Sequence, residues 1–219
     1  TAIGTGALGT QNFTTATDTF NIAVGYDAGV AVTTGVRNTI MGGRAGDALT
    51  DADYNIAIGT DALTADTLGS KSVAIGVDAL GNQNFTTATD SLNTAVGYAA
   101  GLRVTTGISN TLMGANTGDA LTVGTDNVVI GRSALTTDDV GSQNVAIGSS
   151  ALESQNAAGA TANNMLNVAV GFEAGKAVTT GFYGVVIGGK AGIALTTGAK
   201  NVVIGKDTGA TITDGSNNT

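Results

Sequence analysis

One five-residue phrase recurs along the whole chain, as at residues 127–131 (NVVIG). Short, regular self-similarity is typical of solenoids, in which each turn buries its apolar residues against neighbouring turns. The usual interval of 17 residues is too short for a pair of helices, so we expect an all-β, parallel β-solenoid (β-roll) of about twelve 17-residue turns. The final glycine of the phrase occurs at Gly4, Gly25, Gly42, Gly59, Gly76, Gly97, Gly114, Gly131, Gly148, Gly171, Gly188 and Gly205.

The sequence also repeats with a longer period of four turns. Residues 11–18 (QNFTTATD) recur identically at residues 83–90. The chain begins inside one copy of the strand phrase and stops inside another, so we interpret it as an excerpt of a longer protein. We expect one solenoid repeat region, 1–219, built of blocks 1–72, 73–144 and 145–219.

Each turn alternates apolar runs with glycine-containing bends. In one turn, we expect strands at residues 21–24 and 30–34, joined by bends at residues 25–29 and 35–37. Glycines recur two residues after a threonine column, as Gly35 follows Thr33, and we expect a positive φ there. Two strands per turn would give a flattened roll.

The first strand of each turn is apolar on both faces, because Ile22 and Val24 alternate with Ala23. Burial on both faces is typical of strands in parallel sheets. We expect the side that carries Ile22, Val24 and, in a later turn, Ile130 to fill the interior. The Ala23 side then needs a partner subunit as its cover. That side carries Ala23, Ile40, Ala57, Ala74, Ala95, Leu112, Val129, Ala146, Ala169, Val186 and Val203.

Asparagine begins most of these strands, with Ser72 and Gly184 as departures. Stacked strands lie about 4.8 Å apart, a spacing at which like amides hydrogen-bond along a ladder. We expect a structural ladder of Asn21, Asn38, Asn55, Asn93, Asn110, Asn127, Asn144, Asn167 and Asn201, continued by Asn218. A second column, of threonines such as Thr33 and Thr50, is interrupted in three places and favours a structural ladder over an ice-binding face.

Composition excludes several classes of function. The chain has no His or Cys, so the commonest bases, nucleophiles and transition-metal ligands are absent, and we expect no catalytic residue, metal or cofactor. Seventeen acidic residues against nine basic ones give a net charge of −8, which disfavours nucleic acid. No apolar run approaches the roughly 20 residues of a membrane span. The acidic pairs Asp51/Asp53 and Asp138/Asp139 are interpreted as solvated bend residues.

Aromatic residues gather at repeated places. One turn in four has an enlarged bend, at residues 9–20, 81–92 and 153–166, and we expect these bends to project outward about 19 Å apart. Either the aromatic side chains anchor the larger bends by packing, or they contact a carbohydrate. The candidate ligand contacts are Phe13, Phe85, Tyr26, Tyr98 and Phe172, with Ala157 at the third bend.

The phrase N-x-A-[VI]-G, as at residues 55–59 and 144–148, resembles the head repeats of trimeric autotransporter adhesins. The longer unit at residues 93–109 (NTAVGYAAGLRVTTGIS) resembles repeats of phage and bacterial tail-fibre-type surface proteins. This resemblance covers essentially the whole chain. It implies a parallel β-roll, commonly trimeric, that acts as an extracellular shaft or adhesive head.

Together these features predict a structural segment of an extracellular fibre on a cell surface or virion. Its expected partners are copies of itself, in a trimer or filament, and it is not expected to be an enzyme. The alternative is an adhesive, receptor-binding head that contacts a host glycan or matrix protein through the outward bends. Stacked strands give an expected length of about 57 Å for twelve turns.

Overall fold

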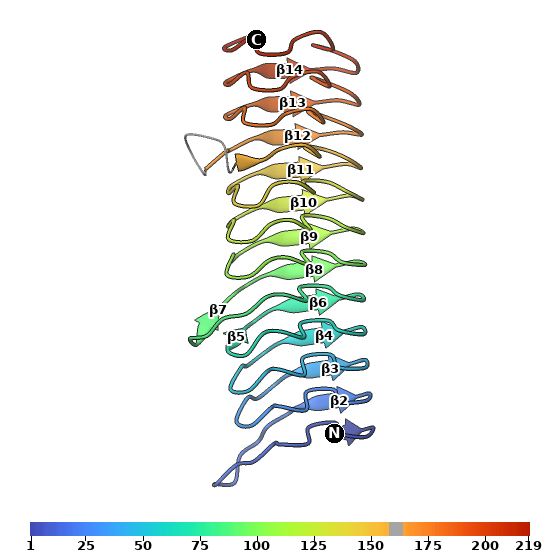
Figure 1. The fold of residues 1–219 in the computed structure, drawn as a ribbon, viewed down its shortest axis with the longest axis vertical. Coiled ribbons are helices and arrows are strands. Elements are labelled where there is room, and N and C mark those ends of the chain that lie inside the picture. The colour runs from blue at the N-terminus through green and yellow to red at the C-terminus, as the bar shows by residue number, and fades with distance from the viewer. Residues whose placement is uncertain (158–163) are drawn as a thin grey trace.

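The computed structural model describes residues 1–157 and 164–219 and shows one long stack of turns (Figure 1). The chain is all-β, and the described ranges contain no helix. Each turn adds one strand to the side of a single parallel sheet, so the two ends of the chain lie at opposite ends of the stack. The expected β-solenoid of about twelve turns is confirmed.

Twelve strands form the main sheet, and two short ones form a small sheet beside it. Neighbours in the main sheet pair residue for residue, as Val128 pairs with Val145 and Ile130 with Ile147. The strands are β1 (Ala2–Ile3), β2 (Ile22–Val24), β3 (Thr39–Met41), β4 (Ile56–Ile58), β5 (Gly69–Ser70), β6 (Val73–Ile75), β7 (Thr89–Asp90), β8 (Thr94–Val96), β9 (Thr111–Met113), β10 (Val128–Ile130), β11 (Val145–Ile147), β12 (Val168–Val170), β13 (Val185–Ile187) and β14 (Val202–Ile204).

Each regular turn contains one strand, so the expected second strand at residues 30–34 is wrong. The chain from the end of one strand to the start of the next, here called the return path, is a succession of tight turns. Alternate amides explain why: Val30 N–H and Val32 N–H donate three residues back along the chain, whereas Ala31 N–H donates to Asp47 O of the next turn. An extended strand would direct none of its amides to its own turn.

The faces of the main strands are the reverse of the expectation. Ala23 and Val129 are fully buried inside the solenoid, whereas Ile22, Val24 and Ile130 point outward. The strand asparagines are also buried, and a strand alternates its faces with a period of two, so residues two positions after an asparagine lie inside as well. The interior therefore takes the Ala23 column, which includes alanines as well as larger residues such as Ile40 and Leu112, and no partner subunit covers that column.

Glycine ends each strand because two requirements coincide there. Gly131 has a φ of 129°, and a Cβ at this residue would lie 2.6 Å from the carbonyl oxygen of Gly148 in the next turn. Gly35 has an ordinary negative φ, contrary to the expectation for the return bends. It is glycine because a Cβ there would lie 2.4 Å from the carbonyl oxygen of Ala52.

The core is filled in two alternative ways within each block. In some turns, the fourth residue after the strand glycine is itself glycine, as at Gly46, and leaves room for the side chain of Leu49 three residues later. In other turns that residue is a buried leucine, as at Leu63, with a φ of 54°. A polar residue, Asp66, then takes the place of Leu49. Moving the leucine therefore frees an interior position for a polar anchor.

Candidate functional site

The strand asparagines hold successive turns together through the backbone. Asn38 is typical: its N–H donates to Asn21 Oδ1 at 2.8 Å, and its Nδ2 donates to Ala52 O at 2.7 Å. Direct amide-to-amide bonds occur in part of the column, as from Asn127 Nδ2 to Asn110 Oδ1 at 3.0 Å. At Ser72 and Gly184 the backbone N–H still donates to the asparagine of the preceding turn. The buried amides therefore stabilise the stack and are not available to a ligand.

The threonine column is also satisfied within the stack. Thr50 Oγ1 donates to Thr67 O at 3.0 Å, and Thr122 Oγ1 donates to Asp139 O at 2.6 Å. Hydroxyl groups that donate to the next turn present no regular donor array to a surface. The column therefore contributes to the connection between turns.

A buried carboxylate one turn earlier anchors the second enlarged bend. Asp66 Oδ1 accepts hydrogen bonds from Gly69 N–H and Phe85 N–H, both at 3.0 Å, and its Oδ2 accepts one from Gln83 Nε2 at 2.5 Å. Burial raises the pKa of Asp66 above its ordinary value, although the hydrogen bonds from Gln83 and the backbone oppose the rise. Among the described residues, no hydrogen bond to Asp66 comes from a cationic side chain.

The same anchor recurs 72 residues later. Asp138 is fully buried and accepts hydrogen bonds from Gly141 N–H, Ala157 N–H and Gln155 Nε2. Its interpretation as a solvated bend residue is therefore wrong. Gln11 is the counterpart of the two glutamines in the first block, and its buried Nε2 has no hydrogen-bond partner. The signal was present in the sequence, because the pattern D-x-x-G recurs at residues 66–69 and 138–141.

The second enlarged bend projects from the stack, but the recurring anchor residues of the bends point inward. Strands β5 and β7 pair beside the main sheet at the base of the second bend, which extends away from the stack (Figure 1). Phe85 is only 6% exposed, and Ala157 is buried. Phe13 is half-buried, and the tip of the second bend, at residues 86–88, is exposed. Phe85 and Ala157 are thus packing residues, and residues 158–163 of the third bend lie outside the described residues.

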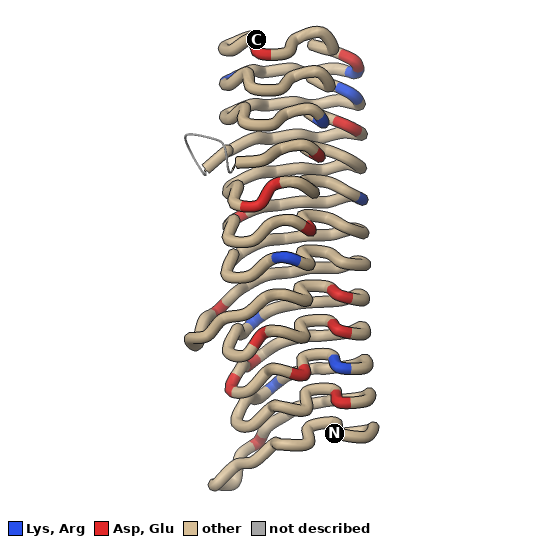
Figure 2. The backbone as a smooth tube through the Cα atoms, in the orientation of Figure 1, with Lys and Arg blue, Asp and Glu red and all other residues tan. Residues whose placement is uncertain are grey.

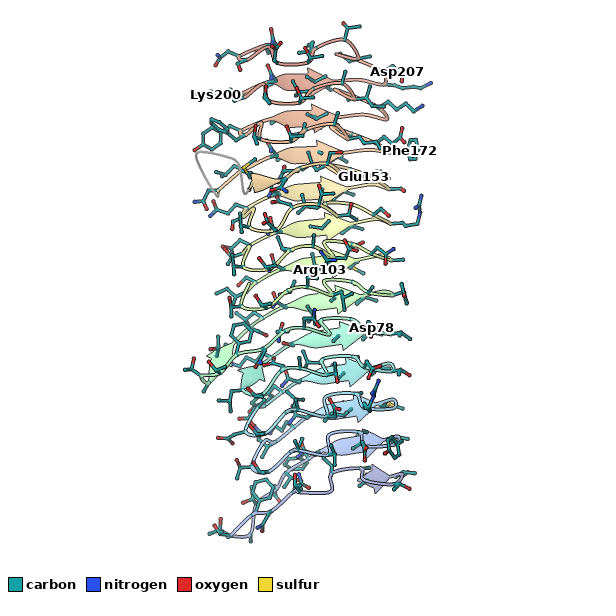
Figure 3. All side chains as sticks on the ribbon, in the orientation of Figure 1. Asp78, Arg103, Glu153, Phe172, Lys200 and Asp207 are labelled. Atoms are coloured by element: carbon teal, nitrogen blue, oxygen red, sulfur yellow. The ribbon has the colours of Figure 1, made fainter. Side chains whose placement is uncertain are left out.

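A second set of aromatic residues is exposed. Tyr26, Tyr98 and Phe172 each follow a strand glycine, and their side chains are 61%, 59% and 53% exposed. Phe172 projects from the same corner of the stack as Asp78 and Asp207 (Figure 3). Successive members are four turns apart, which corresponds to about 19 Å along the stack. Of the five candidate ligand contacts, these three are exposed, Phe13 is partly exposed and Phe85 is buried.

The outer side of the main sheet is an uncharged surface. We define the outward sheet face as the first and third residues of the eleven three-residue strands of that sheet. Seventeen of these 22 residues are Val or Ile, two are Met and three are Thr. All are partly or fully exposed. The sequence showed this apolar character, but the side was assigned to the interior.

Charged side chains occupy the bends and the return path instead (Figure 2). Pairs connect neighbouring turns there, as from Arg44 to Asp61 at 2.7 Å and from Lys71 to Asp90 at 2.5 Å. Both cations and Asp90 are exposed to solvent and Asp61 is partly exposed, so each pair contributes little to stability. Arg103 and Glu153 lie between the two corners of the stack, and Lys200 lies at the corner opposite Phe172 (Figure 3).

Acidic residues also line an open hollow beside the second bend, formed by Asp51, Asp53, Ser70, Thr89 and Asp90. Asp51 and Asp53 accept hydrogen bonds from Thr34 Oγ1 and Val36 N–H of the neighbouring turn. Among residues 1–157 and 164–219, no group of three or more acidic side chains is arranged to hold a metal ion. The same residues include no helix with the length and hydropathy of a membrane span.

Comparison with known proteins gave no relatives. Neither a family model, nor a curated protein, nor a solved structure matches this chain.

Proposed function

We propose that this chain is a structural segment of an extracellular fibre, on a cell surface or a virion, that works as a rigid shaft. The single observation behind the proposal is the unbroken sheet, in which twelve strands pair in register from one end of the chain to the other. Each turn contacts its neighbours, so length increases with the number of turns while the cross-section stays constant. The resemblance to surface-fibre repeats supports the extracellular location.

The mechanism of such a shaft is mechanical. Bending the stack would separate strands on one side, where backbone hydrogen bonds, asparagine amides and threonine hydroxyls all connect adjacent turns. Buried Val, Ile and Leu residues add about 1.5–3 kcal/mol each to the stability of the stack. In this proposal the segment is not an enzyme, needs no cofactor, does not bind nucleic acid and associates with copies of itself.

The shaft is tested by changing its length. A second copy of residues 77–148 inserted after Gly148 adds four turns, and electron micrographs or small-angle X-ray scattering should show a particle longer by about 19 Å with an unchanged width. A wider particle of the same length would contradict the proposal. Antibody labelling of intact cells and virions would test the location, and signal only after lysis would contradict an extracellular role.

Adhesion is the second candidate function, and the exposed aromatic residues favour it. Aromatic faces are suitable for stacking on sugar rings, and Tyr26, Tyr98 and Phe172 recur at one corner of the stack. In this version the contact with a glycan or matrix protein is made at that corner, because Phe85 is buried. Binding on a glycan array that is lost when all three residues are changed to alanine would support it. If the parent protein binds no glycan, adhesion is refuted and the shaft remains as the candidate function.

A further inference from the structure

The outward sheet face is a long exposed surface without charged residues. None of the 9 basic and 17 acidic residues lies at its 22 positions. Soluble monomers rarely expose contiguous apolar patches larger than a few hundred Å². The face is continuous because every strand pairs with the next residue for residue, so the outward columns are not interrupted along the stack.

Its area matches that of a stable protein interface. A three-residue strand is about 10 Å long and twelve stacked strands span about 57 Å, which gives about 570 Å² for the flat projection. Including as a rim the glycine after each strand and the residue that follows it, all partly or fully exposed, widens the contact surface to about 17 Å and enlarges it to about 950 Å². A standard interface buries about 800 Å² on each partner. The face is therefore large enough for one partner of the same length.

The chemistry of the face favours a second copy of the chain. A net charge of −8 repels like molecules, but this face contributes nothing to that repulsion because it is uncharged. A second copy presents the same repeat of about 4.8 Å, and two sheets pack face to face about 10 Å apart. Val and Ile have few rotamers to lose, so their ordering in an interface costs little entropy.

The number of copies follows from the number of apolar faces. A closed ring of three needs two different contact patches on each chain, whereas a two-fold pair uses one patch twice. The return path carries Asp47, Arg103, Asp119 and Lys176, so it offers no second uncharged face. One flat face per chain fits a pair.

We propose that two copies of this chain pack with their outward sheet faces against each other, forming a four-layered rod. This inference rests on the self-association in the proposed function and specifies its surface and its stoichiometry. It also assigns the outward Val and Ile columns to an interface core and the exposed aromatic corner to its rim.

The test compares two lysine substitutions in adjacent segments. Met113 lies on β9, the seventh of twelve strands, so it is near the middle of the interface whichever way the second copy runs. Val123 lies on the return path and is similarly exposed, at 47% against 42% for Met113. By light scattering after size exclusion, the parent and Val123→Lys should both have about twice the 21.3 kDa chain mass. Met113→Lys should weaken the pair at least about 100-fold, because two like charges would meet in a desolvated interface.

A second measurement does not depend on disrupting the pair. A photo-crosslinking residue at position 113 should give a covalent dimer, whereas the same residue at position 123 should not. If Met113→Lys does not fold, as judged by circular dichroism, Val128→Lys on β10 replaces it. A parent protein that is monomeric at about 100 µM, or trimeric, or a Met113→Lys variant that pairs like the parent, would overturn the inference.

Failure of this inference is distinguishable from failure of the shaft. A monomer that still lengthens by about 19 Å with four added turns would refute the pair and keep the shaft. A monomer that binds lipid vesicles through this face would likewise refute the pair, since a membrane would then be the occupant.

Discussion

Placing an aspartate inside or outside the solenoid gives the sharpest test of the strand orientation. Val129 on β10 is fully buried and pairs with Leu112 and Ala146, which are also buried. The next residue, Ile130, points outward. The variants Val129→Asp and Ile130→Asp therefore put the same charge on opposite sides of one strand.

The expected difference is large. An aspartate at residue 129 escapes an unpaired buried charge by taking up a proton, and holding it protonated at pH 7 costs about 4 kcal/mol, since its ordinary pKa is about 3.9. The lost burial of valine adds about 2 kcal/mol, so Val129→Asp should reduce the free energy of unfolding by about 6 kcal/mol. Ile130→Asp loses only strand preference and partial burial, about 1 kcal/mol.

Urea denaturation followed by far-ultraviolet circular dichroism measures both values. Samples are diluted until the midpoint no longer depends on concentration, which separates folding from association. At pH 4 the protonation cost nearly disappears, so Val129→Asp should regain most of the 4 kcal/mol while Ile130→Asp changes little. If Ile130→Asp proved more destabilising than Val129→Asp at pH 7, the assignment of inside and outside would be refuted.

Three further predictions concern the turns. Gly131→Ala should lower the melting temperature strongly, because its Cβ would clash with the carbonyl of Gly148, and an unchanged melting temperature would contradict that close approach. Asp138→Ala should cost about 2–4 kcal/mol in urea denaturation, because Gln155 and two backbone amides lose their acceptor, and proteolysis near residue 157 should accelerate. The pKa of Asp66 is raised by burial, so the folded state binds the proton more tightly and this residue's contribution to stability should increase as the pH falls toward its unfolded value of 3.8. Asp66→Asn should remove that part of the pH dependence, and identical pH profiles would argue against the raised pKa.

The repeat made the solenoid predictable, but local backbone geometry decided how many strands each turn contains. A glycine every 17 residues gave the number of turns and the parallel sheet, because few other arrangements repeat over so short an interval. The second strand at residues 30–34 was wrong because β-branched residues such as Val30 and Val32 also fit a tight turn when a glycine such as Gly29 supplies the positive φ.

The sidedness of the strand could also have been predicted. Asn21 and Ala23 share a face by their spacing of two, and a column of identical amides implies burial with fixed partners. Hydrophobicity alone favoured the larger Ile22 and Val24 for the interior, but the buried asparagine two positions before Ala23 shows which side of the strand lies inside. The outward sheet face was therefore missed as a surface.

The enlarged bends show that the length of a turn does not affect the register of the strands. Turns of 21 and 23 residues replace the usual 17, yet β6 pairs with β8 and β11 with β12 in the same register as any other neighbours. The spacing and register of the strands therefore stay constant when residues are inserted into a bend. Foreign peptides grafted after Thr87 would be carried at a fixed height along the rod, so this chain is suited to displaying antigens or enzymes at defined nanometre intervals.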